Sequence, residues 1–172
     1  MKTSSIILSF VISGTIGFAA MPQQIHALPK PTLVHPLPKT TITEITLERT
    51  ACYGTCPIYK VILESNGIAT YIGMQFVERK GTYKAYISGF EQLAKIVEAR
   101  KYFSFSASYT EPVTDLPSAI TSVVRNGKRK TINNYANSGP IELWEIETLI
   151  DGLIANARWE KVSDITTNPA SN

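Results

Sequence analysis

Histidine is almost missing from this sequence, and cysteine is scarce. The chain of 172 residues has two histidines, His26 and His35, and both precede the segment 42–161 in which regular hydrophobic patterns occur. Without an imidazole, that segment cannot hold a Ser-His-Asp or Cys-His nucleophile system or a mixed Cys/His zinc site. It also lacks a Gly-rich phosphate loop, a G-x-S-x-G elbow and an H-E-x-x-H motif. We therefore expect no catalytic residues, cofactor or metal ion, and the sequence does not favour an enzyme.

A marked excess of charge is also missing. Of the 17 basic residues, Lys2, Lys30 and Lys39 lie outside the segment 42–161, and of the 14 acidic residues only Asp164 does. The segment is left with a net charge of +1. Binding to nucleic acid by phosphate neutralisation needs a strongly basic face. A nucleic-acid partner is therefore not expected.

Residues 1–20 have the pattern of a signal peptide. Lys2 supplies a positive charge, an apolar run extends from Ile6 to Ala20, and small residues suited to cleavage occur between positions 19 and 27. An uncleaved N-terminal anchor is the alternative, and it would be the chain's only contact with a membrane. No cysteine directly follows the run, which argues against a lipid anchor. In both cases we predict an exported protein, periplasmic or extracellular.

Two further segments flank the predicted domain of residues 42–161. Residues 28–41 contain four prolines, which favour an extended polyproline II spacer. Such a segment can also serve as a ligand for a proline-binding groove. Residues 162–172 have no apolar periodicity and are predicted to be a disordered tail.

Alternating apolar and polar residues predict that the first half of the domain consists of β-strands. In the first of them, Ile45 and Leu47 point to one face while the polar residues between them point to the other. Asn66-Gly67 predicts a tight hairpin, because both residues tolerate positive φ angles. The predicted strands are 42–48, 58–64 and 68–74, followed by 76–78 and 82–87 as a further hairpin or as one bulged strand hinged at Lys80-Gly81.

Two helices are predicted in the second half. Ser88 and Glu91 have the spacing of a capping box at the start of the first helix, which ends near Tyr102. Strands 119–125 and 128–135 then flank Asn126-Gly127, a strong hairpin signal. Pro140 suits the first position of the second helix, whose apolar stripe is Leu143, Ile146, Ile150, Leu153 and Ala157.

These elements predict an α+β fold. Hairpins dominate, and regular alternation of strand and helix is missing. We expect a mainly antiparallel sheet of five to six strands, in the order β-β-β-β-α-β-β-α, with both helices packed on one face.

The cysteines, Cys52 and Cys56, are separated by three residues between the first two strands. Export favours a disulfide, and Gly54 gives the chain the freedom to turn between them. A thiol-redox role is one alternative, although redox motifs usually have two intervening residues at the start of a helix. Copper handling is another, because C-x-x-x-C-P resembles the string of Sco-type copper chaperones, but no downstream histidine completes that ligand set.

The segment from Ser104 to Ser118 is long for a loop in a compact domain, and such loops are often functional. Tyr109, Glu111 and Asp115 are weak binding-site candidates there, since two carboxylates and a tyrosine can bind a cation or a sugar. The alternative is a turn at Thr114-Asp115-Leu116-Pro117 in which the Asp115 side chain accepts backbone hydrogen bonds.

A family resemblance rests on the string Cys52-Tyr53-Gly54-Thr55-Cys56-Pro57-Ile58-Tyr59, with Asn66-Gly67, Thr114-Asp115-Leu116-Pro117 and Trp159. With these residues, the chain resembles the bacterial domain of unknown function DUF6438 from Ile42 to Lys161. The resemblance implies a small exported or lipid-anchored protein and supplies no activity, cofactor, partner or functional residue. The chain differs from lipid-anchored members in lacking a lipobox cysteine.

The sequence therefore predicts an exported, non-enzymatic binding or envelope-associated module with a structural disulfide. A protein or another envelope component could be its partner. The alternative is a thiol-redox or copper-handling protein that uses Cys52 and Cys56.

Overall fold

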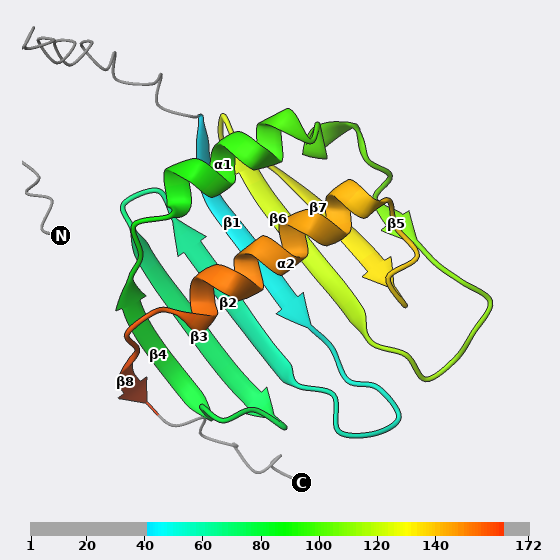
Figure 1. Cartoon of the computed structure of the whole chain (residues 1–172), viewed down its shortest axis with the longest axis horizontal. Helices are drawn as coiled ribbons and strands as arrows, with labels where there is room; N and C mark the ends of the chain where they lie inside the picture. The colour runs from blue at the N-terminus through cyan, green and yellow to red at the C-terminus, as the bar shows by residue number, and fades with distance from the viewer. Residues whose placement is uncertain (1–40, 164–172) are drawn as a thin grey trace, which may run out of the picture. The chain divides into compact units, whose positions relative to one another are not determined.

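A computed structural model of the chain describes residues 41–163 (Figure 1). The predicted signal peptide, all of the proline-rich segment except its last residue, and the tail from residue 164 lie outside the described residues. The elements are β1 (Ile42–Arg49), β2 (Ile58–Glu64), β3 (Ile68–Gln75), β4 (Gly81–Tyr86), α1 (Phe90–Ala99), the short 3-10 helix η1 (Tyr102–Ser104), β5 (Ser108–Tyr109), β6 (Ser118–Arg125), β7 (Lys128–Tyr135), α2 (Ile141–Ala155) and β8 (Glu160–Ser163).

The strands form one sheet in the order β5-β7-β6-β1-β2-β3-β4-β8. All neighbours are antiparallel except β5 and β7, which are parallel. The segment containing α1 returns the chain from β4 to β6, and α2 returns it from β7 to β8 at the opposite edge. Figure 1 shows both helices on one face of the sheet, with α2 running diagonally across the strands. The predicted α+β class and the one-sided placement of the helices are confirmed.

The predicted number of strands was too low. The described residues contain eight strands instead of five or six, because β5 and β8 were missed. Both are too short to show alternation, and both lie at the edges of the sheet, where a neighbouring strand induces them. Strand β8 pairs with β4 and reaches Ser163, two residues beyond the predicted end of the domain.

Both predicted Asn-Gly hairpins are present. Gly67 has a φ of 86°, and Asn126 and Gly127 have φ values of 52° and 73°. The side chain of Asn66 accepts a hydrogen bond from the backbone N–H of Ile68 at 2.8 Å. These turns set the register of β2 with β3 and of β6 with β7.

The predicted start of the first helix was wrong in one respect. Its N-cap is Gly89, which makes no side-chain cap hydrogen bond, so the capping box of Ser88 and Glu91 is not formed. A Cβ atom at Gly89 would lie 2.4 Å from Leu153 of α2. Close packing of the two helices at this point therefore decides how α1 begins.

The core lies between the sheet and the two helices. It is formed by inward-facing strand residues such as Ile45, Val61 and Val123 and by the buried faces of α1 and α2. Within the described residues, neither helix is long and apolar enough to cross a bilayer. The second face of the sheet is not covered by either helix (Figure 1).

Candidate functional site

A cross-strand pair of polar residues lies where β1 ends and β2 begins. Arg49 is the last residue of β1, and Tyr59 is its partner in the antiparallel register. Because side chains alternate along a strand, Arg49 faces the helices together with the fully buried Ile45 and Leu47. Its guanidinium therefore lies at the edge of the apolar core, where an unpaired charge would be costly.

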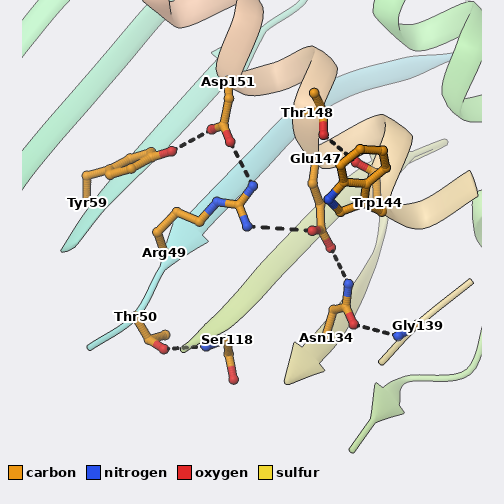
Figure 2. Close-up of polar contacts among 10 residues, drawn as sticks. All are labelled: Arg49, Thr50, Tyr59, Ser118, Asn134, Gly139, Trp144, Glu147, Thr148 and Asp151. Atoms are coloured by element: carbon orange, nitrogen blue, oxygen red, sulfur yellow. Dashed lines mark hydrogen bonds and ion pairs between the residues drawn. The ribbon is translucent and has the colours of Figure 1, made fainter. Parts of the chain in front are cut away.

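Helix α2 supplies two carboxylates from positions one turn apart, Glu147 and Asp151. Asp151 Oδ2 is 2.7 Å from Arg49 Nη2, and Asp151 Oδ1 accepts a hydrogen bond from the Tyr59 hydroxyl at 2.5 Å. Glu147 Oε2 is 3.6 Å from Arg49 Nη1. Figure 2 shows the guanidinium between the two carboxylates. These contacts join the centre of the sheet to the middle of α2.

Glu147 is fully buried. Its Oε1 accepts a hydrogen bond from Asn134 Nδ2 at 2.9 Å, and Asn134 Oδ1 accepts one from the Gly139 N–H at 2.8 Å. Its Oε2 is buried without a hydrogen-bond partner. Burial raises the pKa of Glu147 to about 7, although Asn134 and Arg49 oppose the shift. This carboxyl group therefore changes its charge close to neutral pH.

A pocket of about 330 Å³ adjoins this network at Asp151 and Tyr59. Its volume is sufficient for a small ligand. The lining comes from several parts of the fold: Pro57, Tyr59, Tyr71, residues 76–79, Asp151, Ile154, Ala155 and Trp159.

Three aromatic side chains form one wall of the pocket. Tyr59 and Tyr71 are stacked with ring centroids 5.4 Å apart, and the centroids of Tyr71 and Trp159 are 5.5 Å apart. The indole N–H of Trp159 donates to the Ile154 carbonyl at 2.9 Å, which holds the ring against the end of α2. Aromatic faces fixed in this way suit an apolar or aromatic ligand.

The loop between β3 and β4 forms the rim. A Cβ atom at Gly73 would lie 1.8 Å from the Arg79 carbonyl oxygen, so only glycine permits the loop to fold back onto β3. Phe76 is 51% exposed and has a φ of 53°. A left-handed conformation is unfavourable for a bulky residue and is found preferentially at functional sites.

The disulfide loop lies between β1 and β2. The bond between Cys52 and Cys56 is present, with Cα atoms 5.7 Å apart, which confirms the predicted pairing. The Tyr53 N–H donates to the Asp115 carbonyl at 2.9 Å, and the Ser118 N–H donates to Thr50 Oγ1 at 2.8 Å. The loop thus packs beside the segment that precedes β6.

Of the predicted candidates, Tyr109 lies in β5, and Glu111 and Asp115 lie in the segment between β5 and β6. No hydrogen bond or ion pair joins their side chains to one another, as far as residues 41–163 are concerned. The Tyr109 hydroxyl accepts from the Ser106 N–H at 3.0 Å. The Asp115 carboxylate accepts a hydrogen bond from the Thr114 hydroxyl at 3.0 Å, and no backbone N–H of residues 41–163 donates to this side chain. In the same residues, no group of three or more His, Cys, Asp or Glu side chains could hold a metal ion.

The sequence prediction assigned no role to the polar network of Arg49, Tyr59, Glu147 and Asp151. Two signals in the sequence pointed to parts of it. Arg49 follows Ile45 and Leu47 at every second position of the strand, so its side chain is on the same face. Glu147 and Asp151 each lie next to a residue of the apolar stripe of α2. A charged residue at an inward position indicates a buried partner on the opposing element.

Comparison with protein families gives an independent result. The family described as "Domain of unknown function (DUF6438)" matches residues 43–154, which run from β1 nearly to the end of α2. Comparison with curated proteins and with solved structures gives no significant match. The matched residues include the Arg49, Tyr59, Glu147 and Asp151 network. Because the match covers more than half of the chain, the protein belongs to the DUF6438 family.

Proposed function

We propose that this domain is an exported, non-enzymatic binding module that holds a small ligand in the pocket beside Trp159. The pocket carries the proposal, because it combines a fixed aromatic wall with a rim that includes a strained, half-exposed phenylalanine. Asp151 and Tyr59, the polar groups at its inner end, are already bonded to each other and to Arg49. Because Asp151 and Tyr59 already have hydrogen-bond and ion-pair partners, they are better suited to shape the pocket than to transfer protons.

Export is supported by the disulfide, since such bonds persist in oxidising compartments. The bond also serves the proposed pocket. Pro57 lines the pocket directly after Cys56, and the bridge fixes the loop that places it.

Binding can be tested with a small aromatic probe. The Trp144→Phe variant retains Trp159 as its single tryptophan, so its fluorescence reports on the pocket. We expect phenol or indole to change the emission saturably, and Gly73→Ala in this background to weaken the effect at least about tenfold, because the rim loop must move. The matched control is Gly152→Ala in the helical backbone of α2, where an added Cβ meets nothing within 4 Å. Unsaturable or absent changes in the parent protein would count against a ligand pocket.

Removal of the disulfide separates the structural role from the alternative roles. The Cys52→Ser/Cys56→Ser variant is expected to lose about 2 kcal/mol of unfolding free energy, measured with urea, because a five-residue loop is no longer closed in the unfolded state. We expect the reduced wild type to behave in the same way and to bind Cu(I) only weakly. Tight stoichiometric Cu(I) binding, or a readily reduced bond, would support the copper-handling or thiol-redox alternative instead.

A further inference from the structure

We propose that the pocket selects ligands in which an aromatic or aliphatic body carries a carboxylate, with the Tyr71 hydroxyl and the Arg79 guanidinium binding that anionic group. This inference rests on the proposed binding function and specifies its ligand class. Both residues line the pocket.

Tyr71 and Arg79 both have hydrogen-bond donors that are free to bind a ligand. The Tyr71 side chain is 9% exposed, and its hydroxyl makes no hydrogen bond to any residue between 41 and 163. Arg79 has five N–H donors. Among residues 41–163, its guanidinium has one ionic contact, a 3.4 Å approach to the neighbouring Glu78, which is 84% exposed. Burial raises the pKa of the Tyr71 hydroxyl, although Arg79 opposes the shift, so this hydroxyl keeps its proton and can donate it. A Cβ atom at Gly73 would lie 1.8 Å from the Arg79 carbonyl oxygen and 2.8 Å from Tyr71 Cε1, so both residues adjoin the same point of β3.

The carboxylates of the lining do not oppose an anionic ligand strongly. Asp151 is paired with Arg49 at 2.7 Å and accepts the Tyr59 hydroxyl. Arg49 therefore balances part of the charge of Asp151, which still contributes to the raised pKa of Tyr71. Glu78 points into solvent, where its field is screened. Of the ionic groups in the lining, Glu78, Arg79 and Asp151, Arg79 is the one cation.

The apolar part of the pocket defines the rest of the ligand. Trp159, Tyr71 and Phe76 contribute aromatic surface to the lining, and Ile154 and Val77 add aliphatic surface. A carboxylate held at Arg79 would place its attached body against these groups. The donors supply specificity, and the burial of the apolar body supplies most of the affinity.

The test uses three probes of the same size on the Trp144→Phe protein: phenylacetate, its neutral amide phenylacetamide, and the cation phenethylammonium. We expect phenylacetate to bind about tenfold more tightly than phenylacetamide, because charge-assisted hydrogen bonds replace neutral ones. Arg79→Gln and Tyr71→Phe should each remove most of this preference, because they lower the affinity for phenylacetate more than the affinity for phenylacetamide. Arg129→Gln is the matched control, since it removes a similarly exposed arginine from the uncovered face of the sheet.

The outcomes distinguish the inference from the proposed function. If phenylacetamide or phenethylammonium binds as tightly as phenylacetate, the pocket binds ligands but the anionic specificity is wrong. If Arg79→Gln and Arg129→Gln lower the affinity equally, long-range charge accounts for the preference, and the assignment to Arg79 is wrong. If none of the three probes binds although phenol or indole does, the ligand class is wrong and the pocket proposal stands. If phenol and indole also fail to bind, both proposals fail.

Discussion

Replacement of Arg49 by methionine is expected to lower the free energy of unfolding at neutral pH by about 3 kcal/mol. Removing one partner from a buried ion pair typically costs about 3–5 kcal/mol, because the remaining charge is left without compensation. The lower end of that range applies here, since the Asp151 side chain is 34% exposed and can recover some hydration. Methionine retains the apolar stem, so lost packing contributes little.

The control for this measurement is Arg129→Met. Arg129 pairs with Glu44 at 2.8 Å, but its side chain is 50% exposed on the uncovered face of the sheet. Such a pair contributes about 1 kcal/mol or less. Urea unfolding of both variants gives the comparison directly. Equal losses would mean that the Arg49 network has no special stabilising role, whereas partial rescue of Arg49→Met by Asp151→Asn would assign the cost to the uncompensated carboxylate.

Local features of the fold could be predicted because their causes lie within a few residues. Asn66-Gly67 and Asn126-Gly127 specify their turns by backbone preference alone, and the disulfide closes a loop of five residues. The stripe of α2 was also recognisable, with Leu143, Ile146 and Ile150 buried as expected. At its C-terminal end Ile154 is buried in addition, and Ala157 lies beyond the end of the helix.

The pocket could not be predicted, because its parts come together only through the order of the strands. Tyr59 and Tyr71 are neighbours in the β2–β3 pair, but Trp159 reaches them because α2 carries the chain back across the sheet to β8. Strand β8 itself depends on the edge of β4. A prediction from the sequence had no means of placing residues 151 and 159 beside residue 59.

The burial of Glu147, and with it the raised pKa of its carboxyl group, could not be predicted from the sequence either. Together with Glu142 and Glu145, Glu147 lies in the N-terminal half of α2, where acidic side chains are favoured. Glu142 and Glu145 are partly exposed, whereas Glu147 is buried against Asn134 and Arg49. The position of a glutamate along α2 does not determine whether its side chain is buried. Burial depends on which side of the helix packs against the sheet.

The stability of the wild-type domain is expected to fall by about 3 kcal/mol as the pH rises from about 4.5 through about 7, owing to Glu147 alone. Burial raises the pKa of this carboxyl group from 4.5 to about 7 in the folded state. Between these two values the folded protein retains the proton and the unfolded chain has released it. Stability therefore decreases with rising pH, and the contribution is complete below the unfolded pKa.

The measurement is urea unfolding of the wild type and of Glu147→Gln across this pH range. Glutamine keeps the acceptor for Asn134 but cannot ionise, so the fall in stability should be absent from the variant. Glu145→Gln, on the exposed side of the same helix, controls for the loss of a carboxylate and should retain the fall. Parallel curves for the wild type and Glu147→Gln would show that Glu147 ionises normally.

The two predictions also constrain each other, because Arg49 is the cation that faces Glu147. The guanidinium lowers the pKa of Glu147, while Asp151 on the same helix raises it. In the Arg49→Met protein the opposing charge is removed, so the pKa of Glu147 should rise further and the loss of stability should continue to higher pH. The cost of Arg49→Met should therefore be larger at about pH 8 than at about pH 5, where Glu147 is mostly protonated in the folded state. If the cost is independent of pH, Arg49 acts only through Asp151, and the 3.6 Å approach between Arg49 and Glu147 contributes no measurable stability.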